Sequence, residues 1–164
     1  MPSDIAALFL DHSAKKLDQM NESLAICLGK LTDEQVWQRE AAHQNTIGNL
    51  VLHLCGNMRQ WIMHGVGGAL DVRTRDAEFS TDGGYSSQEL TLLFASTIAE
   101  ATSILTALPH ARLTERINPQ YGEVSVLDAI YQVVGHMQQH VGQIILLTKH
   151  HTSRDLDLTI PRPR

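Results

Sequence analysis

The sequence is poor in the residues that hold small secreted proteins together. It has two cysteines among 164 residues, Cys27 and Cys55, and they do not form a CxxC motif. Two cysteines are too few for a disulfide framework, which excludes a disulfide-rich scaffold. Both lie in apolar helical sequence, so we expect buried free thiols and a cytoplasmic protein.

Basic residues and long apolar runs are also scarce. The chain has 13 Lys and Arg against 18 Asp and Glu, a formal net charge of −5, and its basic residues are scattered. Nucleic acids and anionic membranes need clustered positive charge, so we expect neither as a partner. No apolar run approaches the roughly 18 residues that span a bilayer. The opening segment MPSDIAALFLDHS lacks the basic start of a signal peptide.

What the sequence does have is an ordinary globular composition and many histidines. Hydrophobic residues make up 43% and charged residues 19%, and nine histidines exceed the three Phe and three Tyr together. The length fits one domain with a real core. We predict a single domain at residues 1–153, followed by a C-terminal tail at 154–164.

Apolar residues at spacings of three and four predict four long amphipathic helices. In the first, Leu8, Leu17 and Leu24 are expected on one buried face. The predicted helices cover residues 3–29, 46–64, 86–108 and 125–150.

Local signals mark the starts of these helices. Thr46 is a good N-cap, capping-box patterns begin at Thr32 and Ser86, and Ser125 with Asp128 caps the last helix. About 20 polar, turn-rich residues separate the second and third helices, a length that is typical of a crossover. The sequence therefore predicts an all-α fold, a four-helix bundle with long crossover connections.

The fourth helix carries His136 and His140 one turn apart, so both imidazoles project from the same side. They lie on one flank of the apolar stripe, where they can face a cleft between helices. Neutral imidazole binds Zn, Ni, Fe or Cu. An HxxxH pair is common by chance in a histidine-rich chain, and a solvated surface pair is the alternative interpretation.

His53 is the natural third ligand. It lies inside the second helix, at the edge of the face formed by Leu50, Leu54 and Met58. The alternative is a boundary histidine bonded to a neighbouring carbonyl group. No Glu lies two or three residues from either histidine of the fourth helix, which excludes the HExxH and ExxH metal sites.

Two segments resemble one known family. HMQQHVGQI resembles the HxxxHxGQ[IL] signature on the last helix of the DinB/YfiT-like family, and NTIGNLVLHLCGNMRQWI is similar to that family's second helix. The resemblance implies a three-histidine site of His53, His136 and His140 that holds one divalent transition metal, with Zn or Ni favoured. It also implies a four-helix bundle that forms a homodimer.

Residues around the three histidines have weaker assignments. Gln143 matches the family's Gln position and is expected to hydrogen-bond a ligand or a metal-bound water, while Gly142 is expected to allow close helix packing. His12 and His43 are candidates for the mouth of the cleft, and Tyr121 is a candidate hydrogen-bond donor to a substrate.

Three functions remain open at this point. The resemblance implies a metalloenzyme that transfers a low-molecular-weight thiol, such as bacillithiol or mycothiol, to an electrophilic small molecule. The first alternative is a hydrolase that uses a metal-bound hydroxide, and the second is a non-catalytic metal-binding bundle. The sequence shows no obvious general base beside the histidines, which favours thiol transfer because a thiol supplies its own nucleophile.

Overall fold

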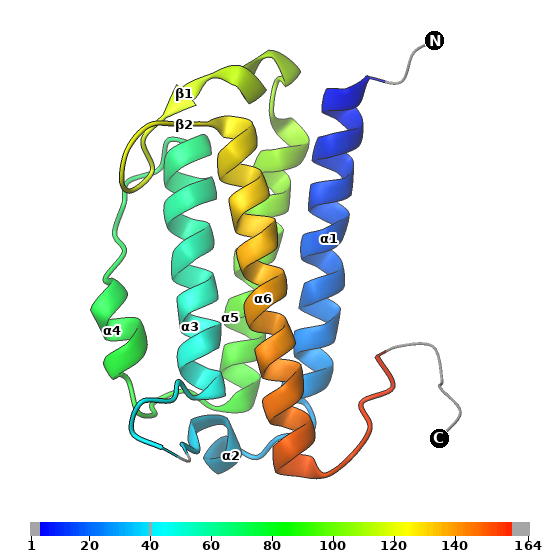
Figure 1. The fold of residues 1–164 in the computed structure, drawn as a ribbon, viewed down its shortest axis with the longest axis vertical. Helices are drawn as coiled ribbons and strands as arrows, with labels where there is room; N and C mark the ends of the chain where they lie inside the picture. Colours follow the sequence, from blue (N-terminus) through cyan, green and yellow to red (C-terminus); the bar gives the residue numbers. More distant parts are fainter. Residues whose placement is uncertain (1–3, 40, 159–164) are drawn as a thin grey trace.

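The structure is a computed structural model and describes residues 4–39 and 41–158. Its long helices form a bundle, as Figure 1 shows, which confirms the all-α fold class. The long elements are α1 (Ile5–Leu28), α3 (Ile47–Met58), which continues into the π-helix η1 (Arg59–Val66), α5 (Ser87–Ala107) and α6 (Val126–Thr152).

The connection between η1 and α5 is the predicted long crossover. It returns along the outside of α3, so that α3 and α5 run in the same direction (Figure 1). This crossover carries a short helix, α4 (Arg75–Ser80), that the sequence analysis missed. The remaining short elements are α2 (Asp33–Trp37), η2 (His110–Thr114) and the antiparallel ribbon of β1 (Arg116–Ile117) and β2 (Val124–Ser125).

Capping boxes begin four of the helices. The two that the sequence predicted, at Thr32 and Ser86, are confirmed, and the predicted cap of Ser125 with Asp128 is also a capping box. Thr46 also begins a capping box, with Asn49 in the position that Glu or Gln usually fills. In each box two N–H groups at the start of the helix gain a side-chain acceptor, which fixes where the helix begins.

The core lies between the long helices. Leu17, Leu24 and Phe94 are completely buried, as their helical spacing predicts. Leu8 was wrongly expected on the same face, because it is 56% exposed. It precedes Leu17 by nine residues, which at about 100° per residue places it on the opposite side of α1.

The second long helix, α3, was predicted to end at residue 64, but it continues to Val66 as the wider π-helix η1. From Arg59 to Val66 it is a π-helix, and the Gly67 N–H donates to Ile62 O at 2.8 Å. A Cβ at Gly65 would lie 2.7 Å from Pro119 Cβ, so the missing side chain allows the β1–β2 loop to pack against η1.

Two further features bear on the sequence predictions. Cys27 and Cys55 are buried free thiols, as expected. Helix α5 is long and apolar enough to cross a membrane by length and composition, a test that core helices of soluble proteins also pass. Of the predicted tail, residues 154–158 are described, with Leu156 in the core, and the remainder lies outside the described residues.

Candidate metal centre

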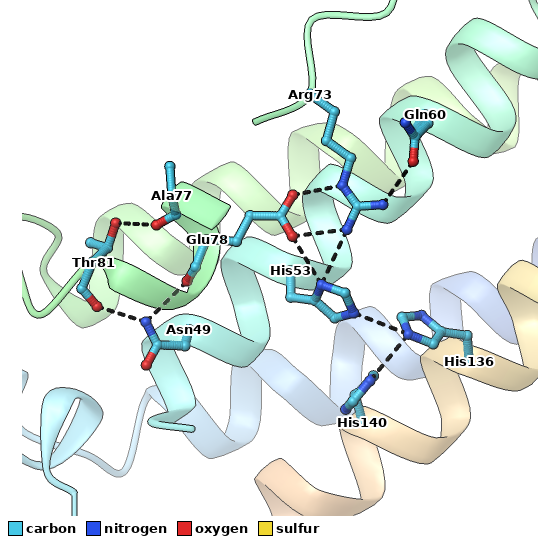
Figure 2. Close-up of polar contacts among 9 residues, drawn as sticks. All are labelled: Asn49, His53, Gln60, Arg73, Ala77, Glu78, Thr81, His136 and His140. Atoms are coloured by element: carbon cyan, nitrogen blue, oxygen red, sulfur yellow. Dashed lines mark hydrogen bonds and ion pairs between the residues drawn. The ribbon is translucent and has the colours of Figure 1, made fainter. Parts of the chain in front are cut away.

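Three histidines from two helices converge on one point. His53 comes from α3, and His136 and His140 come from α6, as Figure 2 shows. His136 Nε2 lies 3.1 Å from His53 Nε2 and 3.1 Å from His140 Nε2. One ring nitrogen from each histidine lies within 4.8 Å of the other two. The structure therefore brings together the three residues that the sequence singled out.

The spacing of these nitrogens fits a shared ion. Metal–nitrogen distances of ~2.0–2.1 Å at angles between octahedral and tetrahedral separate two nitrogen ligands by ~2.9–3.4 Å. Both Nε2–Nε2 distances of 3.1 Å fall in this range. The donor set is also suitable, because three neutral imidazoles are ligands of Zn and Ni. The residues present therefore fit a divalent transition metal.

Hydrogen bonds outside the site fix two of the ring orientations. His53 Nδ1 lies 2.9 Å from Glu78 Oε2, and His140 Nδ1 lies 2.7 Å from Gln143 Oε1. Both oxygens are acceptors, so each Nδ1 carries the proton and donates it. The lone pair is then on Nε2, directed toward the other histidines. Ligand histidines in metal sites are commonly held in this way.

Arg73 Nη2 also lies 3.1 Å from His53 Nδ1. Two N–H donors cannot form a hydrogen bond with each other, so this contact only reflects their shared acceptor. Arg73 instead forms a bidentate ion pair with the Glu78 carboxylate, with Nε donating to Oε1 at 2.7 Å and Nη2 donating to Oε2 at 2.8 Å. The carboxylate thus joins Arg73 to His53 (Figure 2).

Glu78 stays ionised in this arrangement. Burial raises the pKa of its carboxyl group, but hydrogen bonds from Arg73 and His53 outweigh burial and hold the pKa below its usual value. The whole residue is 8% exposed. A buried carboxylate paired on both oxygens has the role of orienting His53.

Two residues of α3 hold the crossover in position beside the site. Asn49 Nδ2 donates to Glu78 O at 3.0 Å and to Thr81 O at 2.6 Å, which docks α4 on α3. A Cβ at Gly56 would collide with Glu78 Oε1, so glycine leaves the space that the carboxylate occupies. The sequence analysis missed Glu78, whose contact with His53 spans 25 residues and follows no helical spacing.

The histidines of α6 are neutral near pH 7. Burial, together with the neighbouring His140 and His53, lowers the pKa of His136 to about 4. Burial also lowers the pKa of His140, against the opposing effect of its hydrogen bond with Gln143. Both rings therefore keep a free lone pair for a metal ion over the neutral pH range.

A cavity of about 300 Å³ adjoins the histidines. It lies between η1, α6, the crossover and the β1–β2 loop, and its lining includes His53, His136, Arg75 and Tyr121. Tyr121, the candidate hydrogen-bond donor to a substrate, is therefore beside the site. His12 and His43 are exposed, and neither lines this cavity.

Solved structures of three bacterial proteins share this fold. A conserved protein of Enterococcus faecalis aligns with a TM-score of 0.72 at 14% identity, over 88% of this chain and 97% of that one. A DinB-like protein of Bacillus cereus aligns at 0.69 and 18% identity, over 86% of this chain and 91% of its own. YjoA, a DinB-like protein of Bacillus subtilis, aligns at 0.64 and 14% identity, over 88% and 91%.

Sequence comparison gives the family. No curated protein matches the chain. The family DUF1572, described as a protein of unknown function, matches residues 4–164, and this family is DinB/YfiT-like. The chain therefore belongs to the DUF1572 family, whose DinB/YfiT-like character confirms the resemblance seen in the two histidine-bearing helices.

Proposed function

We propose that the protein is a metalloenzyme that binds one divalent transition metal, Zn or Ni, and transfers a low-molecular-weight thiol to an electrophilic small molecule. The observation that carries this proposal is the convergence of three Nε2 lone pairs from His53, His136 and His140. The His53 and His140 rings are held in this orientation by hydrogen bonds from their Nδ1 atoms to Glu78 and Gln143, so the orientation is part of the fold.

The donor set supports a catalytic site over a structural one. Structural zinc sites usually have four protein ligands, whereas three ligands leave a position open to a substrate. All three ligands here are neutral, so the ion keeps its full charge. When bound, such an ion lowers the pKa of a coordinated thiol or water, which makes a nucleophile available at neutral pH.

The surroundings of the histidines support thiol transfer over hydrolysis. Both oxygens of Glu78 are engaged by Arg73 and His53, so this carboxylate is not free to act as a general base. No Asp or Glu among the described residues lines the adjoining cavity. A thiol needs no separate base once its proton is lost to solvent, because the sulfur itself attacks the electrophile.

Elemental analysis of the purified protein tests the metal site. We expect about one equivalent of Zn or Ni per chain, and its loss in a His136→Ala/His140→Ala double variant. The matched control is His12→Ala/His43→Ala, which removes two exposed histidines outside the site. No metal in the native protein, even after incubation with Zn²⁺ or Ni²⁺, would contradict the proposal.

Turnover assays separate the proposed reaction from its alternatives. The metal-loaded protein is mixed with bacillithiol, mycothiol or glutathione and with a chloronitrobenzene electrophile, and the thioether product is measured. We expect conjugation that a chelator abolishes. Metal-dependent ester hydrolysis without a conjugate would instead support the hydrolase, and tight metal binding without either reaction would support a non-catalytic bundle.

The assembly and location of the protein stay predictions. We propose a cytoplasmic homodimer that binds neither nucleic acid nor membranes. Size-exclusion chromatography with light scattering at micromolar concentration tests the dimer, and a mass of one chain would contradict it.

A further inference from the structure

The cavity beside the histidines is bordered by two facing rows of polar side chains. On α3 and η1, His53, Asn57 and Trp61 follow at intervals of four residues. On α6, Gln132 precedes His136 by the same interval, so these two lie on one side of that helix. The histidines occupy one end of this cavity, and the polar groups beyond them have no part in holding a metal.

Three buried polar atoms around this cavity lack a partner. In the described part of the chain, Asn57 Oδ1, Trp61 Nε1 and His136 Nδ1 are the buried side-chain nitrogen and oxygen atoms without a hydrogen bond. All three residues line the same cavity. Asn57 is only 7% exposed. Native proteins rarely leave such groups unpaired, so their gathering in one cavity indicates a ligand that supplies the partners.

The charge of the cavity favours an anion. Arg73 and Arg75 line it, and its lining contains no Asp or Glu among the residues that the structure describes. The charge of Arg73 is balanced by Glu78. Arg75 forms no ion pair with any residue in 4–39 or 41–158, and its guanidinium lies 5.1 Å from the centre of the Phe79 ring. Its charge is therefore available to a ligand.

We propose that this cavity is the substrate site and that it selects a small molecule bearing a carboxylate. The carboxylate pairs with Arg75. Nearer the histidines, Trp61 Nε1 donates a hydrogen bond to one polar group of the ligand, and Asn57 Oδ1 accepts a hydrogen bond from another. The choice of this cavity as the substrate site rests on the proposed function, but the pairing with Arg75 does not require the metal.

The size of the site limits the ligand. The cavity holds about 300 Å³, and a neighbouring cavity of about 440 Å³ shares Arg73, Arg75, Gln120 and Tyr121 with it. The first volume lies at the small end of the range for ligand sites, ~300–1,000 Å³. A compact acid therefore fits beside the histidines, and a longer one extends over Arg75 toward the second cavity.

Calorimetric titration of the metal-loaded protein tests the selection of a carboxylate. The probes are phenylacetate, 4-hydroxyphenylacetate and hexanoate, each beside its neutral amide of the same size. We expect at least one acid to bind about tenfold more tightly than its amide, the ratio expected for a charge-assisted hydrogen bond. Equal affinity in all three pairs would overturn the proposal.

A matched pair of arginine variants assigns the preference to its residue. Arg75→Gln is expected to reduce the acid-over-amide ratio about tenfold, to near unity. Arg59→Gln is the control, since Arg59 is exposed and lines a different cavity, not the one that holds His53 and His136. A ratio that survives Arg75→Gln would show that the metal or another group binds the carboxylate, which would overturn the assignment.

Two further variants distinguish a ligand-binding role from a structural one. Asn57→Leu and Trp61→Phe each remove an atom that has no protein partner. We expect weaker binding of the acid in both variants, and in Asn57→Leu an unchanged or higher unfolding temperature of the ligand-free protein. Trp61→Phe also loses packing against the core, so it is judged by its affinity for the acid relative to the amide. A lower unfolding temperature with unchanged affinity would mean that these side chains serve the fold, and would overturn the proposal.

The same titration in chelator-treated protein separates this inference from the proposed function. An acid preference that depends on Arg75 and persists without metal would support the site even if the metal assays overturn the metalloenzyme proposal. A protein that holds one equivalent of metal but shows no acid preference would leave the metalloenzyme proposal standing and overturn the inference.

Discussion

Helix α6 and the crossover between η1 and α5 serve the same three-histidine site by different means. On α6, His136, His140 and Gln143 are placed by helical spacing alone, at intervals of four and three residues. The crossover instead brings Glu78 to His53 through tertiary contacts with α3. The spacing along α6 therefore places His136 and His140, whereas His53 is oriented only when the crossover has docked on α3.

The largest effect is expected from removing a ligand of α6. His136→Ala deletes the nitrogen that lies 3.1 Å from both other Nε2 atoms, so only two of the three ligands remain. We expect metal affinity to fall by more than ~100-fold, beyond the range for residues that only support a ligand. Competition with a chromophoric chelator measures the change. Retained affinity would show that the ion, if bound, is held elsewhere.

A smaller loss is expected from the crossover. Glu78→Gln weakens the acceptor of His53 Nδ1 and leaves the buried Arg73 without its counter-charge. Metal affinity should fall by about 10- to 100-fold, because His53 is still present but less well oriented. Glu100→Gln, on the exposed side of α5, is the control. An affinity equal to that of the control would mean that the crossover does not orient the ligand.

Two glycine variants, one beneath the crossover and one on α6, are expected to change the free energy of unfolding in opposite directions. Gly56→Ala forces a Cβ against Glu78 Oε1, so we expect a loss of about 1–3 kcal/mol in the free energy of unfolding. Gly142→Ala adds a Cβ that meets nothing within 4 Å, and a gain of about 0.5–1 kcal/mol is expected from helix propensity. Urea denaturation measures both free-energy changes. If Gly142→Ala destabilised the protein, the space around this position on α6 would not be open as described.

The smallest effect concerns pH in the metal-free protein. Burial lowers the pKa of His136 from 6.5 to about 4, so between these values the unfolded chain binds a proton that the folded chain does not. Stability should therefore fall as the pH drops from about 6.5 to about 4, by about 1–2 kcal/mol, since the ring is only partly buried. Thermal unfolding with a chelator measures this slope, which His136→Ala should flatten.

The sequence was sufficient wherever the determinants were local. Helical spacing and capping residues predicted the long helices, and the resemblance of two helices predicted that His53, His136 and His140 belong together. Gly142 shows the limit of such inference, because its expected role in close helix packing is wrong: it is exposed, and no atom lies near the position of a Cβ.

The missed features depend on contacts distant in the sequence. The carboxylate of Glu78 is placed by the amide of Asn49, by the guanidinium of Arg73 and by the space above Gly56, and none of these leaves a periodic pattern. The π-helix at Arg59–Val66 likewise has the composition of an ordinary helix end. A polar, glycine-containing crossover predicts a loop, although here it builds one wall of the site.

Asn49 has a consequence for how the protein folds. Its Oδ1 accepts hydrogen bonds from Thr46 at the start of α3, while its Nδ2 donates to the carbonyl groups of Glu78 and Thr81. One side chain therefore caps a helix and docks the crossover, so fraying at the start of α3 weakens the contact that holds the crossover. The first turn of α3 and α4 should open and close as a single cooperative unit, with matching rates of amide hydrogen exchange.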